Sequence, residues 1–104
     1  MHMLERLEAA IAERRHASPE HSYVAQLHHK GLGRIAQKLG EEAVEAVIAG
    51  LAGDEVDMVE EAADLLFHLL VLLGAREVKL AAVLAELERR EGTSGLAEKA
   101  ARTE

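Results

Sequence analysis

DEVDMVEEAADLLFHLLVLL, residues 54–73, is the stretch of sequence that decides the fold. Its first half mixes acidic and apolar residues at helical spacing, and its second half is apolar on almost every side. A helix that is apolar all round is a buried one. The run 65–73 is interrupted by His68 and is too short to cross a bilayer. We therefore expect this helix to lie at the centre of the molecule.

Helical periodicity also marks the segments on either side of this central helix. We expect helices from Met3 to near Arg15, from Ser18 and Pro19 to Lys30, over 32–51 and over 80–90. Glycines at 31, 53 and 74 are typical of helix ends. No run shows the alternation of a strand. The sequence predicts an all-α bundle of about four to five helices, with a domain over 1–91 and a frayed tail over 92–104.

The composition favours one cytoplasmic domain. A chain of 104 residues can bury one core, and with 2% aromatic residues that core must be aliphatic. The absence of cysteine excludes disulfides, thiolate zinc sites and cysteine nucleophiles. No apolar stretch of signal-peptide length follows the first residues, so we expect no membrane segment. A net charge of −7 argues against nucleic acid as a partner.

The broad apolar face of the central helix also bears on assembly. A helix that is apolar all round is difficult to cover in so short a chain. Two copies that share this face would complete the core. We therefore expect a homodimer, or a higher oligomer built from it.

Five acidic residues are spaced so that they share helix faces. At a turn of about 100° per residue, Glu41, Glu45 and Glu42 lie at roughly 0°, 40° and 100° on one helix. Glu61 and Asp64 lie three residues apart on the next helix, which a turn makes an antiparallel neighbour. Clustered carboxylates repel unless they face water or enclose a cation. The pattern indicates either a Mg²⁺ or Mn²⁺ site or a solvated face with ordinary pairing along the helix.

Basic residues precede the acids on the same face. Arg34 and Lys38 lie at roughly 20° and 60° on the same angular scale, and Lys30 lies nearby if the chain barely bends at Gly31. Carboxylates that hold Mg²⁺, beside cations that meet phosphate oxygens, are what a metal–polyphosphate substrate needs. An acidic protein would then bind its anionic substrate through bridging metal ions. The alternative is that the three cations only solvate the surface.

These residues resemble a known group of enzymes. Glu41-Glu42-x-x-Glu45 followed by Glu61-x-x-Asp64 is similar to the signature of the all-α nucleoside-triphosphate pyrophosphohydrolase superfamily, the MazG-like group. The flanking segments resemble one of its short families, phosphoribosyl-ATP pyrophosphohydrolase: SYVA at 22–25, KGL at 30–32, KLGEEAVE at 38–45, EAADLLFHLLVLL at 61–73 and VLAELERR at 83–90. The resemblance extends from Leu4 to about Arg90.

The resemblance implies hydrolysis of phosphoribosyl-ATP to phosphoribosyl-AMP and pyrophosphate, the second step of histidine biosynthesis, by a dimer or larger assembly. It implies that Glu42, Glu45, Glu61 and Asp64 hold Mg²⁺, which bridges the triphosphate and lowers the pKa of a bound water. Glu41 would be a further ligand or the base that takes the proton of the attacking water.

The resemblance also implies roles for residues around the acids. The three cations named above would neutralise the departing pyrophosphate. Tyr23 would help to position the substrate, or would only pack with its hydroxyl at the rim. His68 is expected to be buried, satisfied by a neighbouring carboxylate and ordering Asp64.

Two other functions stay open from the sequence. A house-cleaning enzyme of the same superfamily, acting on dUTP, dCTP or non-standard nucleoside triphosphates, would use the same acids and differ only in how it recognises the base. A non-enzymatic helical module that dimerises through the leucine-rich helix would need no metal ion. Its stability would therefore not change with Mg²⁺.

Overall fold

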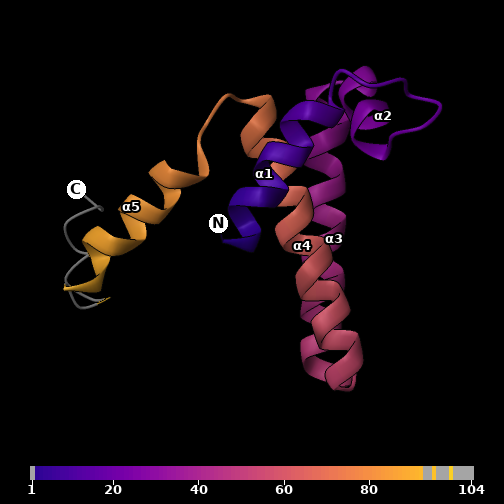
Figure 1. The fold of residues 1–104 in the computed structure, drawn as a ribbon. Coiled ribbons are helices and arrows are strands. Elements are labelled where there is room, and N and C mark those ends of the chain that lie inside the picture. The colour runs from indigo at the N-terminus through magenta and orange to yellow at the C-terminus, as the bar shows by residue number, and fades with distance from the viewer. Residues whose placement is uncertain (1, 93–94, 96–98, 100–104) are drawn as a thin grey trace.

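Every regular element in the described part of the chain is a helix. The computed structural model describes residues 2–92 together with Gly95 and Lys99. The helices are α1 (Met3–Arg14), α2 (Tyr23–Lys30), α3 (Leu32–Ala52), α4 (Glu55–Ala75) and α5 (Leu80–Glu91). This confirms the predicted all-α fold. Figure 1 shows α3 and α4 as a long pair side by side, with α1 and α2 near one end and α5 extending away.

The core lies where the first four helices meet and is completed by Leu80 at the start of α5. Its buried residues are aliphatic, as the composition predicted: Ile11, Val24, Leu27, Ile35, Leu70, Val71 and Leu80. Ile35 and Val71 are the largest side chains that are almost completely buried. The second half of α4 is therefore central, as expected. None of the described helices is both long and apolar enough to span a membrane.

A short connection folds α4 back onto α3. Gly53 follows α3 with an extended backbone, and its amide donates to the Ala49 carbonyl oxygen at 3.0 Å. Asp54 then caps α4, because its carboxylate accepts from the Asp57 amide at 2.9 Å. The Asp57 carboxylate accepts in turn from the Asp54 amide at 3.2 Å, which completes a capping box. This connection sets the acidic faces of the two helices against each other.

The second helix begins later than predicted. Ser18 does not cap it, because its hydroxyl oxygen accepts from the Glu20 amide at 3.2 Å within a separate turn. The cap is Ser22, whose hydroxyl oxygen accepts from the Ala25 amide at 3.1 Å. The prediction was wrong because Ser18 and Ser22 are both suitable N-cap residues, and only Ser22 caps the helix. Tyr23 is therefore the first residue of α2.

The link from α4 to α5 also differs in detail from the prediction. The helix continues one residue past Gly74, and the residue with left-handed backbone is Glu77, at φ 58°. The Leu80 amide donates to the Glu8 carboxylate at 2.8 Å, which holds the start of α5 against α1. The tail predicted over 92–104 falls almost wholly outside the described residues.

A second apolar surface lies on α3 and α4, away from the core. Its side chains are each more than half exposed: Val44, Val47, Ile48, Leu51, Val56 and Val59. Leu51 is 85% exposed. We expected the leucine-rich run 65–73 to lie in the core or between two copies of the chain. Its second half lies mainly in the core. The uncovered apolar surface lies nearer the α3–α4 connection.

Replacing Gly53 with alanine is expected to destabilise the fold by about 1–3 kcal/mol. The added methyl would lie 2.9 Å from the Asp57 Cβ atom and 3.0 Å from the Ala49 carbonyl oxygen. Gly40→Ala, within the α3 helix that Gly53 follows, is the control, since its methyl meets nothing within 4 Å. That variant should gain up to about 1 kcal/mol from helix propensity. Urea unfolding measures both, and an unchanged midpoint for Gly53→Ala would contradict the crowding.

Candidate functional site

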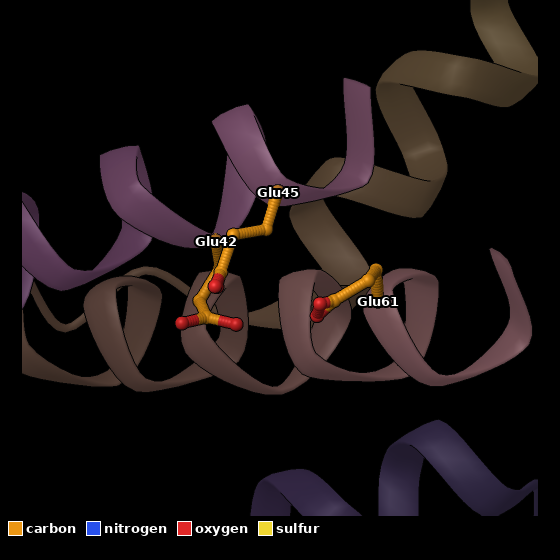
Figure 2. A group of neighbouring side chains, drawn as sticks. All are labelled: Glu42, Glu45 and Glu61. Atoms are coloured by element: carbon orange, nitrogen blue, oxygen red, sulfur yellow. The ribbon is translucent and has the colours of Figure 1, made fainter. Parts of the chain in front are cut away.

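Three carboxylates from α3 and α4 meet at one point. Glu42 and Glu45 project from α3 and Glu61 projects from α4 (Figure 2). Each offers one oxygen such that the three atoms lie within 4.8 Å of one another. Glu42 is only 5% exposed, whereas Glu45 is exposed and Glu61 is half-buried. The group is therefore open on one side, as a cation that also binds water or phosphate would require.

Charge repulsion and burial raise the pKa values of two acids in this group. The negative charge of Glu42, together with a hydrogen bond to it, raises the pKa of Glu45. Burial raises the pKa of Glu61, and the charges of Glu45 and Asp64 raise it further. Both shifts have the direction expected of carboxylates that share a site without a cation between them. The donor set therefore fits a divalent cation, which would favour the ionised forms.

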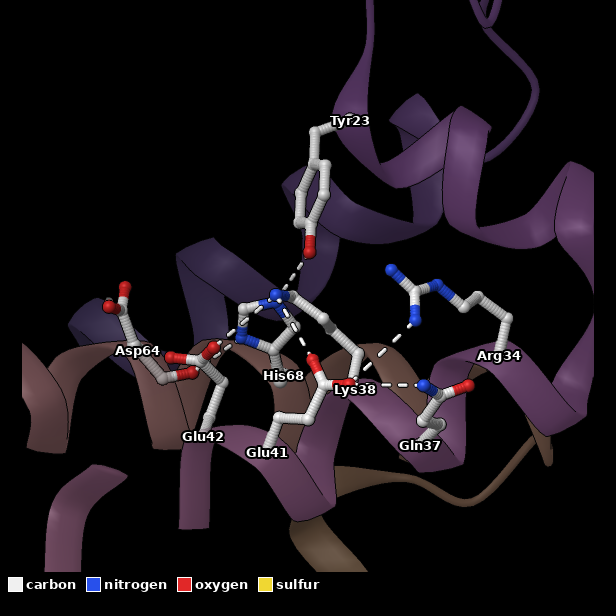
Figure 3. A network of polar contacts seen from close by, with 8 residues as sticks. All are labelled: Tyr23, Arg34, Gln37, Lys38, Glu41, Glu42, Asp64 and His68. Atoms are coloured by element: carbon white, nitrogen blue, oxygen red, sulfur yellow. Dashed lines mark hydrogen bonds and ion pairs between the residues drawn. The ribbon is translucent and has the colours of Figure 1, made fainter. Parts of the chain in front are cut away.

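Asp64 lies beside this group without joining it. It is exposed, and Figure 3 shows its carboxylate turned away from Glu42. Its charge nevertheless contributes to the raised pKa of Glu45 and of Glu61. The structure thus brings together three of the four predicted metal ligands and leaves the fourth within electrostatic range.

Glu41 faces the basic residues instead of the other acids. Its carboxylate accepts from the Gln37 side-chain amide at 3.0 Å and lies 3.5 Å from the Lys38 ammonium. The hydrogen bond from Gln37, together with the Lys38 and Arg34 charges, lowers the pKa of Glu41 despite a smaller opposing effect of burial. Sequence reasoning did not single out Gln37, although its position four residues before Glu41 is a signal for such a bond. Glu41 is therefore an ionised anchor for its neighbours.

Lys38 joins the basic and acidic parts of the site. Its ammonium lies 3.5 Å from Glu41 and 3.5 Å from the buried Glu42, and the Arg34 guanidinium lies 3.9 Å from Glu41 (Figure 3). Burial lowers the pKa of Lys38, but neighbouring charges outweigh it and the pKa is raised. Lys30 ends α2, and among the described residues no hydrogen bond or ion pair connects it to the acids. Of the three predicted cations, Lys38 therefore contacts the acidic group directly, and Arg34 contacts only the neighbouring Glu41.

An aromatic cluster connects α2 to α4. The Tyr23 hydroxyl lies 2.8 Å from His68 Nε2, and His68 Nδ1 lies 2.7 Å from the backbone carbonyl oxygen of Asp64. His68 is buried as expected, but the expected bond to a carboxylate is wrong, because both ring nitrogens have other partners. The Phe67 ring centre lies 6.1 Å from that of Tyr23 and 5.1 Å from that of His68. These rings fix Tyr23 beside the acids.

A groove of about 420 Å³ continues from the acids towards the α3–α4 connection. Beside Glu45 and Glu61, its lining includes Asp57 and Glu60. Sequence reasoning missed these two residues. Asp57 lies four residues before Glu61, which is the spacing that sets two side chains on one helix face. The acidic surface is therefore longer than the predicted motif.

Known proteins match almost the whole chain. The family model described as phosphoribosyl-ATP pyrophosphohydrolase matches residues 4–91. The phosphoribosyl-ATP pyrophosphatase of Novosphingobium aromaticivorans is 65% identical over 101 residues, which are 97% of this chain and 94% of the relative. The protein of the same name from Rhizorhabdus wittichii is 67% identical over 99 residues, 95% and 93% of the two chains. The one from Dinoroseobacter shibae is 58% identical over 102 residues, 98% and 100%. The chain belongs to the phosphoribosyl-ATP pyrophosphohydrolase family.

Proposed function

We propose that this chain hydrolyses phosphoribosyl-ATP to phosphoribosyl-AMP and pyrophosphate, the second step of histidine biosynthesis. The observation that carries the proposal is the group of three carboxylates beside Lys38, with Arg34 paired to the adjoining Glu41. Acids next to cations suit a metal–triphosphate substrate. The relatives named phosphoribosyl-ATP pyrophosphatase match over nearly their full length, which supports this particular substrate.

The proposed cofactor is Mg²⁺, with Mn²⁺ as the alternative. Glu42, Glu45 and Glu61 would hold it, and Asp64 is the proposed fourth ligand because its charge already acts on two of them. An all-carboxylate donor set suits these hard cations. When bound, such a cation neutralises phosphate oxygens and lowers the pKa of a coordinated water.

The remaining side chains have separate tasks in this proposal. Lys38 and Arg34 neutralise charge on the departing pyrophosphate, and Lys30 meets a part of the substrate further from the acids. The sequence leaves two roles for Glu41, a further ligand or the base. Its lowered pKa makes it a weak proton acceptor, so we favour a role in holding Lys38 and Arg34 in place.

We also propose that two copies of the chain form a homodimer through the exposed apolar surface of α3 and α4. Six large aliphatic side chains with more than half of their surface exposed would be costly to leave in water. On α5, which extends away from α3 and α4, Leu84 and Leu87 are also exposed (Figure 1). A larger assembly is the alternative, and light scattering after size-exclusion chromatography measures the mass. The cytoplasmic location stays a prediction from the sequence.

The activity test is pyrophosphate release from phosphoribosyl-ATP with Mg²⁺ or with chelator. Glu42→Gln and Asp64→Ala are each expected to lower kcat/KM at least about a hundredfold, because each removes a carboxylate that would hold the cation beside the reacting phosphate. Glu13→Gln, an exposed position on α1, is the matched control and should change little. Near-normal turnover in both site variants would contradict the assignment. Faster release from dUTP or dCTP would indicate the house-cleaning activity instead.

Metal binding should also appear in thermal melts. Mg²⁺ at about a hundred times its dissociation constant should stabilise the wild type by about 2.7 kcal/mol. Glu45→Gln removes one of the three carboxylates and should reduce this gain. A melting temperature that ignores Mg²⁺ would favour the non-enzymatic helical module.

The raised pKa values predict how stability varies with pH in chelator. Because Glu45 and Glu61 bind protons more tightly when folded, their contribution to stability grows as pH falls from neutral towards the ordinary glutamate value of 4.5. Glu45→Gln and Glu61→Gln should each flatten this increase. The measurement is urea unfolding between pH 7 and about 4.5. A slope unchanged in both variants would show that these acids do not cause it.

A further inference from the structure

The hydrogen-bond chain from Tyr23 to His68 has a fixed direction. His68 Nδ1 lies 2.7 Å from the backbone carbonyl oxygen of Asp64 (Figure 3). A carbonyl oxygen can only accept, so Nδ1 carries the proton in this bond. In the neutral ring, Nε2 then has a lone pair and no hydrogen. The Tyr23 hydroxyl, 2.8 Å from Nε2, is therefore the donor.

The imidazole cannot reverse this direction without losing both bonds. Turning the ring over would set carbon atoms against the Asp64 carbonyl and the Tyr23 hydroxyl. His68 is 6% exposed, so water could not replace the lost partners. Phe67 and Tyr23 also contact the ring edge to face, at 5.1 Å and 5.6 Å between ring centres. The direction of the chain is therefore built into the fold.

The Tyr23 oxygen consequently offers the site only lone pairs. The residue is 43% exposed, so a ligand can reach it. Burial raises its pKa, Lys38 lowers it and Glu42 raises it, which places the hydroxyl among the charged groups of the site and keeps it protonated at neutral pH. Ionised phosphate oxygens also offer only lone pairs. A phosphate would therefore be repelled at this position, whereas a hydroxyl donor would be bound.

We propose that the Tyr23 oxygen accepts a hydrogen bond from a ribose hydroxyl of the bound nucleotide, and that His68 is the positioning residue that sets this direction. The inference rests on the proposed function, because it takes a ribonucleoside triphosphate as the ligand. In the sugar and triphosphate of an ionised nucleotide, the ribose hydroxyls are the donors. Lys38 and Arg34 thus meet phosphate while Tyr23 meets the sugar. Lys38 is the competing donor within the chain.

The test is a double-mutant cycle in which the Tyr23 hydroxyl is removed from the protein, a ribose hydroxyl is removed from the ligand, or both are removed. Calorimetry measures binding of ATP, 2′-deoxy-ATP and 3′-deoxy-ATP in the presence of Mg²⁺. We expect wild type to bind one deoxy analogue roughly three- to tenfold more weakly than ATP, the usual worth of one neutral hydrogen bond. Tyr23→Phe should bind ATP about as weakly as wild type binds that analogue. It should no longer distinguish the two ligands.

Variants of His68 test the positioning role. His68→Gln retains an oxygen that can accept from the Tyr23 hydroxyl and should retain the preference for ATP. His68→Leu removes that acceptor and should lose the preference, as Tyr23→Phe does. Circular dichroism confirms that each variant is folded. A merely structural role for His68 would weaken binding of all three nucleotides by the same factor in His68→Leu and leave the preference intact.

Several results would overturn the inference. These are equal binding of the three nucleotides by wild type, no measurable binding of ATP, or an unchanged preference for ATP in Tyr23→Phe. If Tyr23→Phe keeps the preference but binds all three nucleotides more weakly by the same factor, the Tyr23 oxygen accepts from Lys38 and not from the ribose. Turnover of phosphoribosyl-ATP is measured on the same samples. Turnover without ribose discrimination would contradict this inference and leave the proposed function standing. Ribose discrimination without turnover would contradict the proposed function and leave this inference standing.

Discussion

The buried carboxylate of Glu42 is the constraint on which the site depends. A charge with so little access to water needs a compensating partner. Lys38 supplies one at 3.5 Å, and Glu41 in turn holds Lys38 from the other side. Glu45, however, adds a second negative charge close by, which Lys38 alone does not balance, and its pKa is raised as a result. The folded site therefore contains carboxylate repulsion that a bound divalent cation would relieve, and such binding would be linked to stability.

The helices divide the work of the site between them. Helix α3 supplies both charges of the ion pair, helix α4 faces it with a further acid, and α2 presents an uncharged hydroxyl at its first residue. The two long helices are set by their capped connection, whereas α2 is set by the cap at Ser22 and by the stacking of Tyr23 on Phe67. The charges thus come from α3 and α4 and the hydroxyl from α2, while His68 on α4 sets the direction of the hydrogen bond that this hydroxyl makes.

The sequence predicted what depends on periodicity. The all-α fold, the central position of α4 and the convergence of Glu42, Glu45 and Glu61 all follow from residue spacing along regular helices. Side-chain orientation does not follow, because a spacing leaves the rotamer open, and so the outward turn of Asp64 was not predicted. The choice between a carboxylate and a backbone carbonyl as the partner of His68 was also not predictable. The backbone partner of His68 depends on contacts between helices that a single sequence does not display.

The closeness of the acids along the chain has a consequence for folding. Glu42 and Glu61 are 61 − 42 = 19 positions apart and are joined through a single helix-to-helix turn. Closing so short a segment costs little chain entropy compared with bringing α1 onto α4. The pairing of α3 with α4 thus costs less chain entropy than the docking of α1 on α4, and it is also the step that brings like charges together. An available cation would therefore speed the formation of the hairpin itself, and chelation would slow refolding more than it would speed unfolding.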